Sequence, residues 1–231
     1  MNNKKNIVIT GGNRGIGLGL VENLSSMNNV IFTSRDRVVA EEIVDKAKNR
    51  SIEINYVLMD VNDSQSIAKA SEEVSQKFKS VDLLFNNAGI LLNEYQLPAL
   101  DTSEKSILDT FNTNTLGVLR VCKSIVPLMK NGGRIINISS GMGQLIEMES
   151  GSTAYRISKT ALNTITKILS NELIDNNIKV NAICPGWVQT DMGGKNATLT
   201  VQESVQKITE FALRKNFPNG KFLRHGEVIP W

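Results

Sequence analysis

Short runs of apolar and β-branched residues alternate along the chain with longer stretches in which apolar positions recur at helical spacing. Several of the short runs are apolar along most of their length, which predicts strands buried on both faces of a parallel sheet. These runs lie at residues 6–10, 30–34, 54–59, 81–86, 134–139 and 179–184. The helical patterns cover residues 15–27, 38–49, 64–78, 103–129 and 152–175. This alternation predicts an α/β fold, a doubly wound parallel sheet with helices on both faces.

The uninterrupted series of predicted strands and helices indicates one domain that spans residues 1–231. No Pro/Gly/Ser-rich linker, internal repeat or low-complexity tract interrupts the series. Asp63-Ser64 is a candidate cap for the third helix, and Ser152 or Thr153 for the fifth. The longest loop-like stretches, 93–101 and 185–200, follow strands, so we expect both at the carboxyl edge of the sheet, where ligands bind in this architecture. We expect a small substrate lid at about 185–215.

Composition excludes several classes of protein. The 231 residues are 41% hydrophobic and 21% charged, which is typical of a soluble globular chain. The net charge of +3 is too small to indicate nucleic-acid binding. The apolar runs are too short for a membrane span, and the N-terminus lacks the long apolar run of a signal peptide. We therefore expect a cytoplasmic protein with neither a nucleic-acid nor a membrane partner.

The cysteines and the histidine narrow the chemistry further. Cys122 and Cys184 have no CxxC spacing, which favours structural thiols in a reducing compartment. His225 is the only histidine, which excludes a histidine-cluster zinc site and the usual Ser-His-Asp triad. We expect no metal.

A glycine-rich segment joins the first predicted strand to the first helix. It reads Thr10-Gly-Gly-Asn-Arg-Gly-Ile-Gly17, with the spacing G-x-x-x-G-x-G. Glycines permit a tight turn and close packing of helix on sheet, and the free N–H groups at the helix start favour a pyrophosphate. Taken alone, a glycine-rich turn without a ligand is an equally good interpretation. The segment is not a Walker loop, because no G-x-x-x-x-G-K-[ST] occurs.

Three further patterns carry possible chemistry. Tyr155 and Lys159 are four residues apart on a predicted helix and share a face, so the ammonium could lower the pKa of the phenol. Ser139-Ser140 ends a predicted strand, where a hydroxyl could hydrogen-bond a substrate carbonyl. The segment 86–89, Asn-Asn-Ala-Gly, ends another strand, and its small residues let a ligand approach the backbone. Each pattern alone also fits a purely structural role.

Together and in this order, the four patterns resemble the short-chain dehydrogenase/reductase superfamily, from about residue 7 to residue 192. The resemblance implies a Rossmann-type fold and hydride transfer between a nicotinamide cofactor and a carbonyl. The glycine-rich segment from Gly11 to Val21, the segment from Pro185 to Gly194 and the ending Ile229-Pro230-Trp231 are similar to the small carbonyl reductases of the sniffer and C-factor type.

The resemblance assigns catalytic roles to four residues. Tyr155 would donate a proton to the carbonyl oxygen, and Ser140 would polarise the carbonyl, with Ser139 as the second choice. Lys159 would bind the nicotinamide ribose and lower the pKa of Tyr155. Asn114, in the context N-x-x-G, would hold a water that links Lys159 to solvent. Asn112 lacks the following glycine.

The resemblance also assigns a set of cofactor contacts. The positions are Gly11, Asn13, Arg14, Ile16, Asp60, Val61, Asn87, Ala88, Gly89, Tyr155, Lys159, Pro185, Gly186, Val188 and Thr190. Asp60 would lie at the adenine edge, although an aspartate there could equally be a helix-proximal cap.

Charged residues after the second strand favour NADPH over NADH. An NAD-selective site places an acid at the end of that strand, whereas this strand ends in Ser34-Arg35. The Arg35 guanidinium matches the oxygens of a 2′-phosphate, and Arg14 adds a second positive charge. Asp36 is expected to cap the next helix instead. We therefore expect NADP(H) as cofactor.

The leading interpretation is a cytosolic NADPH-dependent reductase of ketones or aldehydes. The alternative is an NAD(P)-binding signalling or sensor protein with little turnover, which the full set of catalytic residues disfavours. The short stretch between Asp191 and Val205 predicts an open site for small or varied carbonyls. Apolar residues on more than one face of the helices at 103–129 and 152–175 predict a homodimer or homotetramer.

Overall fold

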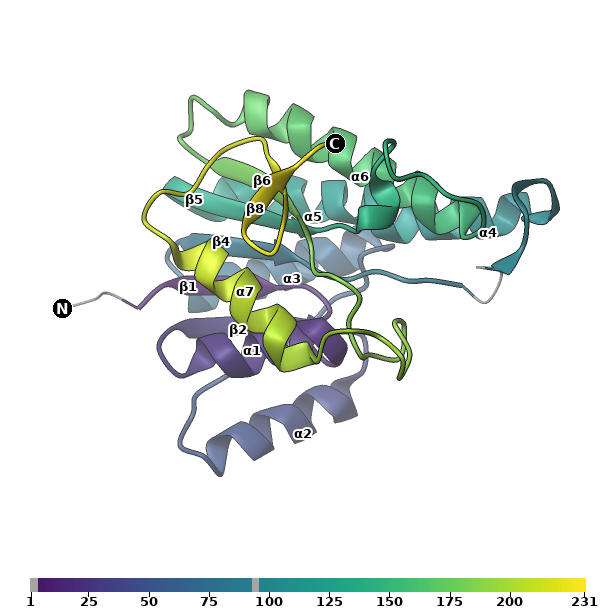
Figure 1. Cartoon of the computed structure of the whole chain (residues 1–231). Coiled ribbons are helices and arrows are strands. Elements are labelled where there is room, and N and C mark those ends of the chain that lie inside the picture. The colour runs from purple at the N-terminus through teal and green to yellow at the C-terminus, as the bar shows by residue number, and fades with distance from the viewer. Residues whose placement is uncertain (1–3, 93–95) are drawn as a thin grey trace.

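The computed structural model describes residues 4–92 and 96–231, and these form a single α/β domain around one eight-stranded sheet (Figure 1). The strand order is β3-β2-β1-β4-β5-β6-β7-β8, and every neighbouring pair is parallel except β7 and β8. The strands are β1 (Asn6–Ile9), β2 (Asn29–Ser34), β3 (Asn55–Leu58), β4 (Val81–Asn86), β5 (Met129–Ile138), β6 (Lys179–Cys184), β7 (Phe222–Arg224) and β8 (Glu227–Ile229).

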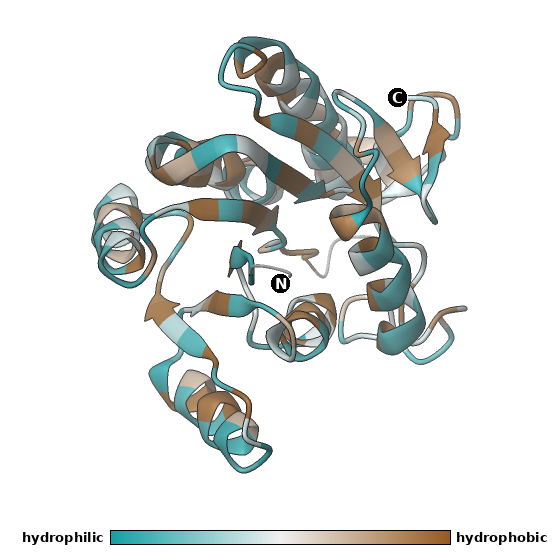
Figure 2. Ribbon diagram, turned by 90° about the vertical axis from the view of Figure 1, so that its left-hand side faces the viewer, coloured by the Kyte–Doolittle hydropathy of each residue, from teal (hydrophilic) through white to brown (hydrophobic). Residues whose placement is uncertain are grey.

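Helices cover both faces of this sheet. The helices are α1 (Gly15–Ser25), α2 (Arg37–Lys48), α3 (Ser64–Lys77), α4 (Glu104–Phe111), α5 (Gly117–Ile125), α6 (Thr153–Glu172) and α7 (Val201–Leu213). Successive strand residues supply opposite cores: Ile7 and Ile9 pack with α1, α2 and α7, while Val8 packs with α3, α5 and α6. Figure 2 shows hydrophobic segments concentrated in the strands between these two layers.

All six predicted strands and the doubly wound fold are confirmed, with small differences at the ends. The main strand difference is β5, which begins at Met129 rather than Arg134, with an irregularity in its pairing to β4. The sequence interpretation missed β7 and β8, which have three residues each, and also missed α7.

The helix predicted at 103–129 is interrupted. It consists of α4, a π-helical turn at Asn112–Leu116, α5 and a short 3₁₀ turn at Val126–Leu128. A π turn widens the helix by one residue per turn and is frequent at functional sites. Asn114 lies at the centre of this turn.

Two predicted caps differ in outcome. Asp63 caps α3 and accepts a hydrogen bond from Gln65 N at 2.8 Å, as expected. Ser152 occupies the cap position of α6, but its backbone is left-handed at φ 52° and its side chain makes no cap hydrogen bond to the first turn of the helix.

Part of the segment 185–215, which was predicted to be a lid, is a helix. Residues 201–213 are α7, which begins with a capping box between Thr200 and Glu203. Val205, Ile208 and Phe211 on this helix are buried in the core that contains α1. Of the other predicted loop, 93–95 lie outside the described residues and Ala99–Asp101 form a 3₁₀ turn.

The parallel strands bring four loops to one edge of the sheet. β1, β4, β5 and β6 are neighbours, so the loops after residues 9, 86, 138 and 184 leave the sheet side by side. The strand order reverses between β1 and β4, where doubly wound sheets form their ligand crevice. Among the described residues, no helix is both long and apolar enough to cross a membrane.

Candidate active site

The turn between β1 and α1 presents a helix N-terminus at this edge. Gly11 and Gly15 have φ angles of 63° and 52°, which residues with a side chain rarely adopt. A Cβ on Gly17 would overlap the Gly11 carbonyl and lie 2.5 Å from Asn87 Nδ2, so the packing requires glycine. Asn13 and Ile16 are partly buried in the same turn.

The start of α1 is suited to an anion. It has no side-chain cap and no acidic residue in its first turn. Its first N–H groups and the positive end of its dipole therefore favour a negatively charged group such as a pyrophosphate. This local chemistry fits a dinucleotide cofactor.

Thr10 joins the glycine turn to the end of β4, a role that the sequence interpretation missed. Its Oγ1 accepts hydrogen bonds from Asn87 N at 3.0 Å and Ala88 N at 3.1 Å. The Asn87 side chain donates in return to the carbonyls of Thr10 and Gly11, both at 3.0 Å. A threonine directly before the first glycine was the available signal. The two predicted cofactor segments are thus one hydrogen-bonded unit.

The two arginines predicted to recognise phosphate differ in their side-chain contacts. Arg35 is exposed, directly follows β2 and makes no hydrogen bond or ion pair with any described residue. Arg14 is also exposed, but its guanidinium pairs with Asp191 at 3.2 Å. Asp36 caps α2 by accepting from Val39 N at 3.2 Å, as expected, so the Asp36 carboxylate is turned to the helix.

Asp60 and Val61 lie just after β3, separated from its last residue by Met59. Asp60 Oδ1 accepts from Asn62 N at 2.9 Å, and α3 is capped by Asp63 rather than by Asp60. The Asp60 side chain is partly exposed. Val61 is buried against Gly117, because a Cβ placed on Gly117 would lie only 3.0 Å from the Val61 side chain.

The π turn fixes Asn114 between two segments of the site. The Asn114 amide donates to Ile90 O at 2.9 Å and to Ser158 Oγ at 3.0 Å, and its oxygen accepts from Ile90 N at 2.8 Å. A Cβ on Gly89 would lie 3.1 Å from Asn114 Oδ1 and 3.7 Å from Lys159 Nζ, so these three residues are neighbours.

Asn112, the rejected alternative to Asn114, is directed elsewhere. Its side chain donates to Asn62 Oδ1 at 3.1 Å and accepts from Arg120 at 2.7 Å. Of the two asparagines, only Asn114 contacts the loop after β4 and α6.

Tyr155 and Lys159 lie on the first turns of α6, beside the end of β5. The Lys159 ammonium is buried, donates to Ile138 O at 2.8 Å and lies 5.5 Å from the centre of the Tyr155 ring. Ser158, between them in sequence, donates to Tyr155 O at 2.7 Å. Ser158 thus connects Asn114 to the helix backbone at Tyr155, a contact that sequence spacing did not reveal.

The structure separates the two serines after β5. Ser139 is buried, and its hydroxyl donates to Asn163 Oδ1 at 2.6 Å, away from the site. Ser140 is partly exposed, and its hydroxyl is hydrogen-bonded with the Tyr155 side chain. Ser140 Oγ also accepts from Met142 N at 3.2 Å. Of the two serines, Ser140 is therefore the one that contacts the Tyr155 side chain.

Burial dominates the electrostatics of the pair. It raises the pKa of the Tyr155 phenol above its usual value, and the hydrogen bond with Ser140 acts in the opposite direction. Burial lowers the pKa of Lys159 to about 8. The Lys159 ammonium is hydrogen-bonded to Ile138 O, and burial is the largest influence on the pKa of Tyr155.

The loop after β6 folds back onto the glycine turn. Pro185 O accepts from Ser204 Oγ at 2.7 Å, and Gly186 has a φ angle of 85°. Val188 is buried and bridges to Leu199. Thr190 Cγ2 lies 3.3 Å from the position of a Cβ on Gly15.

A small cavity lies beside Tyr155. Its walls are Leu91 and Leu92 after β4, Ser106 and Thr110 on α4, and Ser152, Ala154 and Tyr155 at the start of α6. The site thus combines an apolar recess with a phenol, a serine hydroxyl and a buried ammonium. This combination can bind a carbonyl oxygen and deliver a proton to it.

Comparison with known proteins defines the class of protein. Residues 5–199 match the short chain dehydrogenase family, and the chain belongs to this family.

Two solved structures are similar over nearly the whole chain. The carbonyl reductase Sniffer of D. melanogaster is 33% identical with a TM-score of 0.91, covering 99% of this chain and 100% of that one. The NADPH-bound carbonyl reductase from chicken fatty liver is 31% identical with a TM-score of 0.90 and the same coverage. Among curated proteins, carbonyl reductase [NADPH] 1 of Rattus norvegicus is 26% identical over 97% of both chains. The predicted resemblance to sniffer-type reductases is confirmed.

Proposed function

We propose that the chain is an NADPH-dependent reductase of ketones or aldehydes. The observation that carries the proposal is the meeting of Ser140, Tyr155, Lys159 and Asn114 next to an uncapped, glycine-lined helix start. The names of the Sniffer, chicken and rat relatives support carbonyl reduction, and the last two also support NADPH.

The proposed contacts to the cofactor come from two groups of segments at the carboxyl edge of the sheet. The glycine turn with Asn13, Arg14 and Ile16 would hold the pyrophosphate, and Arg35 the 2′-phosphate. Asp60 and Val61 would border the adenine. On the other side, the loop segments after β4 and β6 would flank the nicotinamide, with Asn87, Ala88, Gly89, Pro185, Gly186, Val188 and Thr190. NADPH, when bound, supplies the hydride for the carbonyl carbon.

Tyr155 is the proton donor in this proposal. Because burial raises its pKa, the phenol is protonated at neutral pH, which is the form that a general acid requires. Ser140 donates a hydrogen bond to the carbonyl oxygen and stabilises the charge that develops there. The apolar walls of the cavity at Leu91 and Leu92 exclude water from the reacting carbonyl.

Lys159 and Asn114 return the proton. Lys159 binds the ribose hydroxyls, and its lowered pKa of about 8 lets the ammonium exchange protons near neutrality. The side-chain oxygen of Asn114 already accepts from Ile90 N and has a second lone pair. That lone pair can hold a water between Lys159 and solvent.

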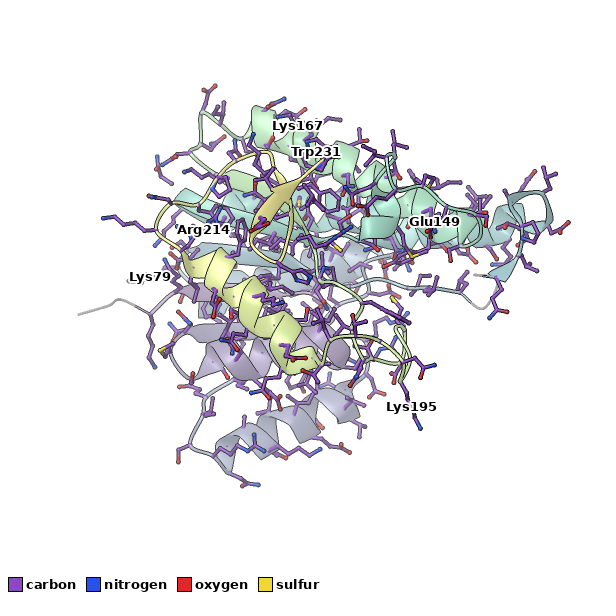
Figure 3. All side chains as sticks on the ribbon, in the orientation of Figure 1. Lys79, Glu149, Lys167, Lys195, Arg214 and Trp231 are labelled. Atoms are coloured by element: carbon purple, nitrogen blue, oxygen red, sulfur yellow. The ribbon has the colours of Figure 1, made fainter. Side chains whose placement is uncertain are left out.

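A panel of ketones and aldehydes, followed by NADPH absorbance, tests the proposal. We expect turnover of several compounds, because the stretch between Asp191 and Val205 is short and leaves an open site with room for varied carbonyls. Lys195, in this stretch, points outward in Figure 3. Tight NADPH binding with no turnover of any compound would instead support a sensor protein.

The choice of cofactor is tested at Arg35. The kcat/KM of wild type for NADPH should be at least about tenfold higher than its kcat/KM for NADH. A factor of this size corresponds to the binding free energy of one charge-assisted hydrogen bond. Arg35→Ala should lose this preference, while the Lys48→Ala control at the far end of α2 should keep it. Equal use of both cofactors by wild type would contradict the assignment.

We also propose that the chain forms a homodimer or homotetramer. Leu108 on α4 and Ile157 and Ile168 on α6 are 65%, 43% and 48% exposed, although the two helices pack together. A second copy of these helices would cover them. Light scattering at micromolar concentration should give a multiple of 25.4 kDa, and a monomer mass would be the contrary result.

A further inference from the structure

The loop that follows Ser140 is held by the C-terminal strand pair. Arg224 on β7 donates from Nη2 to Gln144 Oε1 at 2.7 Å and to Glu147 Oε2 at 2.8 Å. Gln144 is 1% exposed, and its Nε2 donates to Pro230 O at 2.8 Å. Both ends of the buried Gln144 amide are therefore bound by the C-terminal segment.

The same arginine packs directly beside the catalytic serine. A Cβ on Gly141 would lie 2.5 Å from Arg224 Nη2, so the guanidinium lies against the backbone at this glycine. On the same side, Gly141 N donates to Cys184 Sγ at 3.1 Å. Cys184 and Arg224 are paired across β6 and β7. The residue next to Ser140 is thus fixed by two neighbouring strands.

The strand pair that carries Arg224 is firmly anchored. Phe222 on β7 is completely buried, and Trp231 stacks on its ring at a centroid distance of 5.7 Å. Figure 3 places Trp231 at the C-terminal end of the chain, next to the sheet. Arg224 therefore projects from a rigid support onto a loop that has no regular structure beyond the 3₁₀ turn Gly141–Gly143.

We infer that Arg224 is a positioning residue for the reaction: by its hydrogen bonds to Gln144 and Glu147 and its packing against Gly141, it fixes the Ser140 hydroxyl against Tyr155. This inference rests on the proposed function, because it concerns the same catalytic serine. Ser140 directly precedes this loop, and its hydroxyl is hydrogen-bonded with the Tyr155 side chain. A displacement of a catalytic group by about 1 Å can cost about 10²-fold in rate.

The contact with Glu147 contributes more to geometry than to stability. The two side chains are 30% and 54% exposed, and ion pairs this exposed contribute little to the free energy of unfolding. The loss of Arg224 should therefore release the loop while the domain stays folded.

The test compares Arg224→Ala with Arg224→Lys and with the control Lys48→Ala. Lys48 forms an exposed pair with Asp45 at 3.4 Å on α2, far from this loop in sequence. We expect kcat for an aldehyde to fall at least about tenfold in Arg224→Ala, with the Kd for NADPH within about twofold of wild type. A lysine ammonium can donate to the same acceptors but lacks the planar guanidinium that packs against Gly141, so Arg224→Lys should recover part of kcat.

Amide hydrogen exchange gives a second readout that needs no turnover. Exchange at residues 141–147 should accelerate in Arg224→Ala and stay as in wild type in Lys48→Ala. If wild type reduces no carbonyl compound, the proposed function fails and exchange alone decides the role of Arg224. Unchanged exchange in this loop would overturn the inference, as would a kcat within about threefold of wild type or an equal loss of NADPH affinity.

Discussion

The two sides of the candidate site are built from different kinds of contact. On the side of β1 and α1, glycine backbone and main-chain N–H groups form the surface, and side chains such as Thr10 brace it from behind. On the side of β5 and α6, the surface consists of side chains that are oriented by buried hydrogen bonds from Asn114, Ser158 and Ile138. The first side is suited to binding a charged ligand, and the second to moving a proton.

This difference predicts how each side fails. Loss of a side chain from the catalytic side removes chemistry without reshaping the cofactor surface, whereas an added methyl on the glycine side blocks binding. Lys159 belongs to both sides, because Gly89 of the cofactor segment and Tyr155 of the catalytic helix are its neighbours.

The largest effect is expected for Lys159→Met, since this residue connects the two sides. We expect kcat/KM for NADPH to fall by about 10³-fold or more. Both a higher Kd for NADPH and a lower kcat should contribute to this loss. Steady-state kinetics and a fluorescence titration of NADPH measure the two parts. An unchanged Kd would mean that Lys159 belongs to the catalytic side alone.

A smaller effect, on stability and on cofactor binding, is expected for Gly17→Ala. The new Cβ would overlap the Gly11 carbonyl, so the turn must shift, at a cost of about 1–3 kcal/mol in the free energy of unfolding. NADPH affinity should fall at least about tenfold. Asn23→Ala is the control, because Asn23 is an exposed residue of the same helix. If the folded variant binds NADPH as wild type does, the glycine side is not the cofactor surface.

The smallest effect is a dependence of stability on pH. Burial lowers the pKa of Lys159 to about 8 in the folded chain, whereas the unfolded chain keeps the ordinary value near 10.4. Between these two values the unfolded state binds more protons, so the contribution of Lys159 to stability rises with pH. Below pH 8 the buried charge is destabilising.

Urea unfolding of wild type and Lys159→Met at several pH values checks this. The stability of wild type relative to Lys159→Met should be lowest near pH 7 and should rise from pH 8 to pH 10. A stability difference between the two proteins that stays constant from pH 7 to pH 10 would show that burial of the Lys159 ammonium does not destabilise the folded chain.

The two sides also differ in how far the sequence could predict them. The glycine turn and the segment 86–89 lie directly after buried strands, so their place at the sheet edge follows from the strand pattern. The Tyr155–Lys159 pair follows from helical spacing. The choice between Ser139 and Ser140 could not be made from position alone, because it depends on Asn163, 24 residues away from Ser139 in sequence.

Other features were hidden for physical reasons. No proline interrupts residues 104–125, so a continuous helix was the natural prediction and the π turn at Asn112–Leu116 was not foreseen. Strands of three residues, such as β7 and β8, are too short to show an alternating pattern. The contact of Arg224 with Gln144 spans 80 residues.

The helix α7 did carry a signal. Thr200 and Glu203 have the spacing of a capping box, and Val201, Val205 and Ile208 follow at helical intervals. The expectation of a lid over this region obscured both.

The most direct test of the account compares Tyr155→Phe with wild type for binding and turnover in the same preparation. The phenylalanine ring keeps the packing of Tyr155 but has no proton to donate, and a positioned general acid contributes about 10²–10⁴-fold. We predict that kcat for an aldehyde falls by that factor while the Kd for NADPH stays within about twofold of wild type. Near-normal turnover by Tyr155→Phe would contradict the account.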